Sequence, residues 1–254
     1  MSTTLLVAFV VVLAISVVFS MFGKGGGSLY TPVLMMLGWE VGAAISTALF
    51  LNLVTALVAT YVFARNRLVD FKFSSLFLPG TIAGSILGAI LSSRAPKDLL
   101  LGIFSAFLFG VGALMLLSSK SDHTQPVRRL SKKLGAVVVL FSFAVGVLSS
   151  LIGVGGGLII FPFLVLYMKY PAQKAAGANA LIVTVSSVVG SAGHFTVGHI
   201  EYLLIGITAV AAMIGSAIGS HITVKASPSF VKVAFALIMW FFGGEIALHL
   251  LGIL

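Results

Sequence analysis

A lysine at position 24 lies between two apolar stretches, where a charged side chain is unexpected. Residues 3–22 carry no charge, Lys24 stands within the run 23–28 (GKGGGS), and a second apolar stretch continues to residue 37. An ionisable residue inside a hydrophobic segment is by default a functional candidate, and its positive charge predicts an anionic substrate. A lysine near a helix end also reaches the membrane surface by extending its side chain, so this structural interpretation stays open.

The glycine run around Lys24 returns 130 residues later, again between apolar stretches. The equivalent glycines are Gly25, Gly26 and Gly27 in the first run and Gly155, Gly156 and Gly157 in the second. Because glycine is a poor helix former, each run is expected to end one helix and start another. The first turn of a helix has unsatisfied N–H groups and a partial positive charge that attract anions. Paired breaks predict a substrate site, and close packing of helices is the alternative.

Polar residues near each glycine run are further candidates for contact with the substrate. They are Ser28, Thr47 and Asn52 in the first half and Asn179 in the second, and the last three interrupt otherwise apolar helices. Asn179 closely follows Gly177, where its amide would be placed to donate a hydrogen bond to an anion. A hydrogen bond to a neighbouring helix is the alternative role for each of these residues.

His194 and Glu245 are candidates for proton coupling. A histidine titrates near neutral pH, and Glu245 lies deep in the last apolar stretch, where it needs a partner. A serine, a backbone group or a second copy of the chain would supply that partner, so a homo-oligomer is an expected state. Asp70 and Glu201 are acids at loop edges, and we expect each to cap the helix that follows it.

The composition indicates a membrane protein. The 254 residues are 59% apolar and 8% charged, with a mean hydropathy of +1.20, whereas a soluble domain has about 25% charged residues. Several uncharged windows are long enough to span a bilayer. The net charge of +9 comes from basic residues in short loops, so no nucleic-acid partner is expected. No cysteine, metal-ligand spacing or nucleophile–base pair is present in the sequence, so neither a cofactor nor an enzyme is expected.

An internal repeat divides the chain into residues 1–118 and 134–254, joined by a polar linker over 119–133. Each half holds five apolar segments, of which the second is short. The expected segments are 3–22, 25–38, 41–64, 73–93 and 98–118, then 134–152, 156–168, 172–195, 202–223 and 229–252. The predicted fold is therefore all-α and polytopic, with two repeats that each contain a short, glycine-broken helix. The glycines on the fourth segments predict close helix packing.

The charges in the loops favour an inverted arrangement of the two repeats. With five crossings per half and a cytoplasmic linker, twelve of the fifteen Lys and Arg residues lie inside, Arg94 and Lys97 lie outside, and Lys24 lies within the membrane. Four crossings per half would spread the charges nearly evenly. The positive-inside rule thus predicts two inverted repeats, a cytoplasmic linker and both termini outside. Inverted repeats around broken helices are typical of alternating-access carriers.

The paired glycine runs, each followed by a proline, resemble those of the TauE/SafE family of membrane transporters. These prolines are Pro32 and Pro162, and a Gly-Ser-x-x-Gly pattern on both fourth segments extends the resemblance over essentially the whole chain. The family's Thr-Ser pair departs here to Thr47-Ala48 and Ala178-Asn179. The resemblance implies the export of sulfite or organosulfonates across the plasma membrane.

The sequence therefore predicts a secondary transporter of small sulfur-containing oxyanions, acting within the bilayer and driven by protons or by the membrane potential. An anion channel, or a carrier of other small organic anions, is the alternative, and an intramembrane enzyme fits least well. A channel would share the same site but would lack alternating gates.

Overall fold

The computed structural model describes residues 2–91, 97–119, 132–152, 157–194 and 201–250, and this part of the chain is helical. The all-α prediction is therefore confirmed. The elements are α1 (Ser2–Ser20), α2 (Gly27–Met36), α3 (Val41–Arg65), α4 (Phe71–Ser74), α5 (Phe77–Leu91), α6 (Lys97–Ser119), α7 (Lys132–Ile152), α8 (Gly157–Pro162), the π-helical η1 (Phe163–Tyr167), α9 (Ala172–His194), α10 (Tyr202–Lys225) and α11 (Pro228–Leu250).

Five of the described helices are long and apolar enough to cross a bilayer. Their spanning windows are Thr3–Ser20, Gly42–Arg65, Leu134–Leu151, Tyr202–Lys225 and Pro228–Leu248. Two shorter apolar helical stretches, Phe104–Ser118 and Gly157–Tyr167, accompany them. Many of the large exposed side chains are hydrophobic, such as Met36, Leu140 and Phe241 at 86%, 71% and 68% exposure. Such a surface suits lipid rather than water, and it agrees with a multi-pass membrane protein.

The second helix of each half is short, as the sequence predicts. Helix α2 has 10 residues, which corresponds to a length of about 15 Å at 1.5 Å per residue. Helix α8 has 6 residues and continues directly into the 5 residues of η1. Neither stretch is long enough to cross a hydrocarbon core of about 30 Å alone, so both begin inside the protein.

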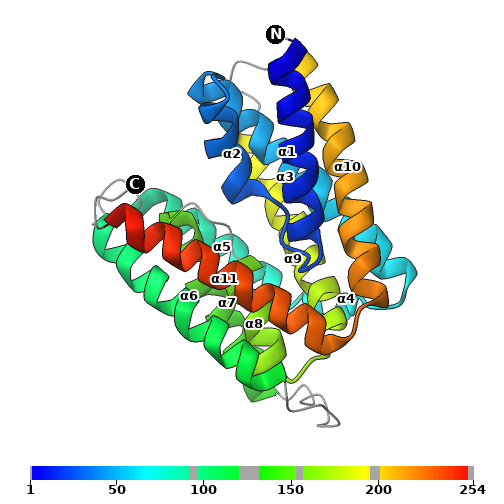
Figure 1. Ribbon diagram of the computed structural model, residues 1–254. Helices are drawn as coiled ribbons and strands as arrows, with labels where there is room; N and C mark the ends of the chain where they lie inside the picture. Colours follow the sequence, from blue (N-terminus) through cyan, green and yellow to red (C-terminus); the bar gives the residue numbers. More distant parts are fainter. Residues whose placement is uncertain (1, 92–96, 120–131, 153–156, 195–200, 251–254) are drawn as a thin grey trace.

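Helices from the two halves of the sequence pack against each other throughout. Helix α1 packs along α10, and α5 packs along α7. Figure 1 shows two groups, one containing α1, α2, α3 and α10 and the other containing α5, α6, α7 and α11. Helix α9 packs on α3 and also contacts α5 and α11, so it links the groups. Each group thus contains helices from both halves.

Glycines allow the close approach of α5 to α7 and of α1 to α10. A methyl group at Gly84 of α5 would collide with the Phe143 carbonyl of α7 and lie 3.0 Å from the Val147 amide nitrogen. A methyl group at Gly215 of α10 would lie 2.7 Å from Cβ of Ser16 on α1. Small residues let helix backbones approach closely in membranes. The predicted packing role of these glycines is therefore confirmed.

The fourth segment of the first half differs from the prediction. Asp70 caps the four-residue helix α4 by accepting a 2.9 Å hydrogen bond from the Phe73 amide, and the chain then turns into α5.

Glu201 is the N-cap residue of α10 but makes no capping bond; its carboxylate accepts from the Trp39 indole at 3.0 Å instead. The expectation of a capping bond is confirmed for Asp70 and wrong for Glu201, because the indole competes for its carboxylate.

The contact between α1 and α10 gives a direct test of this packing. We expect Gly215→Ala to destabilise the protein by about 1–3 kcal/mol, because the added methyl group must displace backbone on α1. The midpoint of thermal unfolding in detergent should fall by about 5 °C.

Gly206→Ala is the matched control, since Gly206 lies on the same helix and a methyl group there meets nothing within 4 Å. Alanine is the better helix former, so this change should leave the midpoint unaltered or raise it. Equal losses in both variants would contradict the packing role of Gly215.

Candidate functional site

The chain leaves α1 through a turn that only glycine adopts easily. Gly23 has φ 65°, in the left-handed region. Its N–H donates to the Ser20 carbonyl at 3.0 Å, and the Lys24 N–H donates to the Phe19 carbonyl at 3.1 Å. These two bonds form a Schellman motif, which satisfies carbonyls at the end of a helix. The turn delivers Lys24 to the start of α2.

Lys24 is buried, with an exposure of 3%. Its Nζ donates to Ser28 Oγ at 2.6 Å and lies 4.5 Å from the ring centroid of Phe19 and 5.6 Å from that of Phe242. These contacts, in the described part of the chain, are one hydroxyl and two aromatic faces, and they include no carboxylate. A cation–π contact contributes about 0.5–2 kcal/mol, whereas burying an ammonium ion costs several kcal/mol. Stability alone does not account for this lysine.

The second glycine run reaches the same place. A methyl group at Gly157, the first residue of α8, would lie 2.9 Å from Cγ of Lys24 and 3.1 Å from Cγ2 of Val183. The starts of α2 and α8 therefore meet at Lys24, as the sequence predicts. Gly155 and Gly156, which belong to the predicted site, lie outside the described residues.

Asn52 of α3 supports the start of α2. Its Oδ1 accepts from the Gly27 N–H at 2.9 Å, and its Nδ2 donates to Ser187 Oγ of α9 at 2.7 Å. The glycines of the run make room for this side chain: a methyl group at Gly25, where φ is 70°, or at Gly27 would run into the Asn52 amide. Asn52 thus acts as a helix cap supplied by a neighbouring helix. Because the Gly27 N–H is bonded to Asn52, it is not available to a substrate.

Asn179 of α9 joins the two breaks and is fully buried. Its Nδ2 donates to the Phe22 carbonyl at 2.8 Å and to the Gly157 carbonyl at 3.1 Å. Its Oδ1 has no hydrogen-bond partner among the described residues. Both bonds of the Asn179 amide donor go to backbone carbonyls, so the expected hydrogen bond from this amide to an anion is not prepared here, and the free Oδ1 can only accept a hydrogen bond.

Hydroxyl groups beside the site tie α2 to its neighbours. Tyr30 of α2, fully buried, shares hydrogen bonds of 2.8 Å with Ser16 of α1 and with Thr55 of α3. Ser216 of α10 donates to the Thr55 carbonyl at 2.6 Å. Because α2 is short, these bonds add to its packing on α3 and to the Asn52 cap in fixing its position.

The sequence did not single out the aromatic residues that enclose Lys24. Phe19 and Phe242 pack edge to face at 5.6 Å, and Phe22, Phe161 and Phe235 form a second cluster with centroids 4.5–5.7 Å apart. The chain has 20 phenylalanines, so their number alone points to none of them. Only the fold shows that α1, α8 and α11 bring these rings together.

Three further predicted residues have no described contact with Lys24. Thr47 is buried on α3, and its hydroxyl has no partner among the described residues. Glu245 lies at an exposed position on α11. His194 is the last residue of α9, and its side chain lies outside the described part of the chain. The roles of these residues in binding or coupling stay predictions.

The arrangement suits the binding of an anion. A buried ammonium group, a serine hydroxyl and the positive end of the α2 dipole lie together, and each favours negative charge. No group of three or more metal-ligating side chains occurs among the described residues.

Comparison with known proteins finds one family model and several relatives. The family model described as "Sulfite exporter TauE/SafE" matches residues 8–246. The "Probable membrane transporter protein YunE" of Bacillus subtilis is 26% identical over 249 residues, with 89% of this chain and 91% of the relative covered. A "Probable membrane transporter protein" of Methanocaldococcus jannaschii is 24% identical, with 88% of each chain covered. No solved structure matches.

The bridging role of Asn179 is testable through stability. We expect Asn179→Ala to lower the free energy of unfolding by about 1–3 kcal/mol, because two buried carbonyls lose their donor. Thermal unfolding in detergent measures the loss. Asn66→Ala is the control, since Asn66 is exposed and donates only to the Val62 carbonyl. A loss at Asn179 no larger than at Asn66 would show that the bridge contributes nothing.

Proposed function

Because the chain belongs to the sulfite exporter TauE/SafE family of membrane transporters, we propose that it is a secondary transporter of small sulfur-containing oxyanions. The proposed cargo is sulfite or an organosulfonate, and the proposed direction is export across the plasma membrane. The family is one of transporters, so the protein is not an enzyme. The cargo, the direction and the membrane rest on the arguments that follow.

The single observation that carries the proposal is the buried amine of Lys24. It is 3% exposed, and no carboxylate lies against it in the described part of the chain. A buried ammonium group is stable only when a counter-charge or several hydrogen bonds compensate for the lost water. A substrate anion supplies that counter-charge, so binding relieves a cost that the substrate-free protein bears.

The surroundings of Lys24 set the shape of the proposed site. Ser28 Oγ lies 2.6 Å from Nζ, and the N–H of Gly27 is already bonded to Asn52. The anion would thus replace Ser28 as the partner of Nζ, or join it, at the positive end of the α2 dipole. Gly157 and Asn179 bound the site on the side of the second half.

The helix pairing supports two related repeats, 1–118 and 134–254; that they are inverted, with a cytoplasmic linker over 119–133 and both termini outside, is proposed from the charges of the loops. When the first repeat is matched to the second, α1 corresponds to α7 and α5 to α10. The observed pairs α1–α10 and α5–α7 are then equivalent contacts. In such a scaffold, exchange of the two repeat conformations moves a central site from one membrane face to the other.

Proton coupling and self-association complete the proposal. Glu245 is exposed on α11, and a carboxylate facing lipid is costly. Protonation, or contact with a second copy of the chain, would remove that cost. His194 is the other proposed coupling residue.

The burial of Lys24 favours a carrier over the alternative of an anion channel. A channel site stays connected to water when the channel conducts, whereas a carrier site closes on both sides during its cycle. Phe19 and Phe242 cover Lys24 in this structure. Accumulation of anion against its gradient in proteoliposomes would distinguish the carrier, because a channel only dissipates gradients.

The proposed site predicts a separation of binding from stability. We expect Lys24→Ala to abolish saturable binding of sulfite and sulfoacetate, because the counter-charge is gone. The thermal midpoint of the substrate-free protein should stay level or rise, since the variant no longer buries an amine. Isothermal calorimetry and thermal unfolding of the purified protein measure the two effects.

Lys174→Ala is the control, because Lys174 is exposed on α9 and its removal changes the net charge equally. This variant should bind like the wild type. Binding that survives Lys24→Ala would move the anion to the helix starts alone. Binding of other small anions in place of sulfite and sulfoacetate would overturn the sulfur assignment and retain the carrier.

A further inference from the structure

A polar hollow lies where α3 and α10 end, at residues that the proposed substrate site does not use. A space of about 290 Å³ is lined by Tyr61, Val62, Arg65, Asn66 and His221. A neighbouring groove of about 400 Å³ is lined by Ala217, Ile218, His221, Ile222 and Lys225. His221 borders both, so the two hollows form one continuous surface, here called the α3–α10 groove.

The α3–α10 groove lies at the ends of two helices that are long and apolar enough to cross a bilayer. The spanning windows of α3 and α10 end at Arg65 and Lys225, the two basic residues of the groove. Residues near the ends of both helices line the same hollow, so these ends share one membrane face. Tyr61, one turn before Arg65, is 58% exposed. Exposed tyrosines at this depth are typical of the boundary between hydrocarbon and water.

The polar side chains of the groove are arranged so that they can bind a negatively charged group. Arg65 Nη1 donates to the Tyr61 hydroxyl at 3.3 Å, and its guanidinium lies 5.7 Å from the Tyr61 ring centroid. These contacts hold the guanidinium group at the groove. His221 Nδ1 pairs with the Ala217 carbonyl at 2.7 Å, which leaves Nε2 directed away from the helix. Neither Arg65 nor Lys225 pairs with a carboxylate in the described part of the chain.

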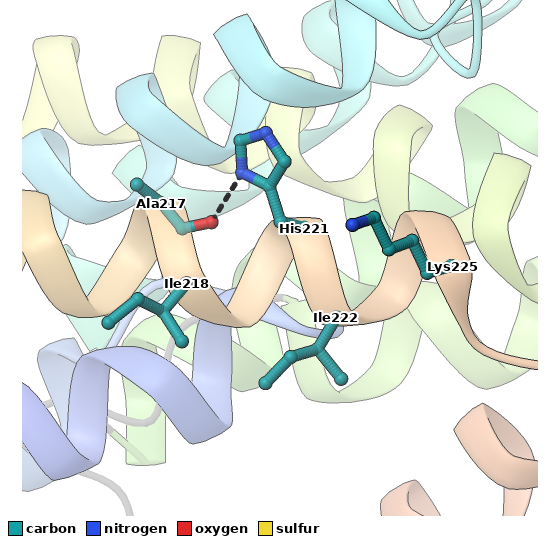
Figure 2. Close-up of a pocket in the computed structure, with 5 residues that line it drawn as sticks. All are labelled: Ala217, Ile218, His221, Ile222 and Lys225. Carbon is teal, nitrogen blue, oxygen red and sulfur yellow. Dashed lines mark hydrogen bonds between the residues drawn. The ribbon is translucent and has the colours of Figure 1, made fainter.

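An apolar row runs from the basic residues toward the middle of the membrane. Figure 2 shows Ile218 and Ile222 on α10 beside the row of Ala217, His221 and Lys225. Ile214, Ile218 and Ile222 are 44%, 45% and 38% exposed, and their spacing of four residues places them on one face. A free phosphate ion makes no favourable contact with this apolar row, whereas the acyl chain of a lipid would cover it.

From these observations we propose that the α3–α10 groove is a binding site for an anionic phospholipid. Arg65, His221 and Lys225 bind the headgroup phosphate, and Ile218 and Ile222 contact an acyl chain. Basic pockets between membrane helices suit such headgroups. The site is separate from Lys24, and it stands whether or not the proposed substrate is correct.

Native mass spectrometry of the protein in detergent tests the site, with phosphatidylglycerol and phosphatidylcholine of identical acyl chains as probes. We expect the wild type to bind phosphatidylglycerol at least about tenfold more tightly than phosphatidylcholine. The variant Arg65→Gln/Lys225→Gln should lose this preference while its binding of phosphatidylcholine is unchanged. Ile218→Ser should weaken the binding of long-chain phosphatidylglycerol and leave that of a short-chain form unchanged.

Lys72→Gln/Lys174→Gln is the matched control, since it removes two charges at exposed positions on α4 and α9 outside the groove. It should bind phosphatidylglycerol like the wild type. An equal loss in this control would assign the preference to overall charge and overturn the site. Equal binding of the two lipids by the wild type would also overturn it. Displacement of the lipid by equimolar glycerol 3-phosphate would assign the groove to soluble phosphates instead.

Discussion

In hydrocarbon, each backbone N–H and C=O group needs a partner within the protein, and this constraint governs how a membrane helix is interrupted. The chain interrupts helices twice, after α1 and after α7. Asn52 caps the start of α2 through the Gly27 N–H, and Asn179 donates to carbonyls at both breaks. The glycines form the breaks, and α3 and α9 each contribute one amide side chain that satisfies backbone groups there. The packing of α3 on α9 is therefore a condition for the site.

The same constraint explains why the lysine is informative. Ser28, Phe19 and Phe242 together supply one hydrogen bond and two weak electrostatic contacts to Lys24, which return less than the several kcal/mol that burial of an ammonium ion costs. Residues that cost stability without a structural benefit are expected at functional sites. A cation that has no carboxylate partner among the described residues, at the junction of α1, α2, α8 and α11, is best understood as half of an interaction whose other half is the substrate.

The sequence predicted the helices and the glycine breaks because these depend on local composition, and the internal repeat predicted that the two breaks meet. Three features can be recognised without knowledge of the fold: the long apolar runs, the short second segment of each half and the paired glycines. The aromatic cover over Lys24 was missed because Phe242 lies more than 200 residues from Lys24, in a chain with many phenylalanines. Glu201 was misjudged for a related reason: its partner Trp39 is 162 residues away. Charge and glycine carry strong local signals, whereas the choice of a partner in space does not.

The glycines that pack the helices repeat between the two halves, whereas the charge at position 24 does not. Gly84 and Gly215 occupy matching places in the proposed repeat and serve equivalent contacts between helices. Lys24, in contrast, aligns with Val154, so the two glycine breaks together contain one cation rather than two. Duplicated packing with a single charge fits a scaffold that moves symmetrically around one anion. The rings on Lys24 come from α1 and α11, one in each of the two packed groups of helices, so relative motion of these groups would change the burial of the amine. Binding of an anion at Lys24 would thus bias that motion, which is the coupling that alternating access requires.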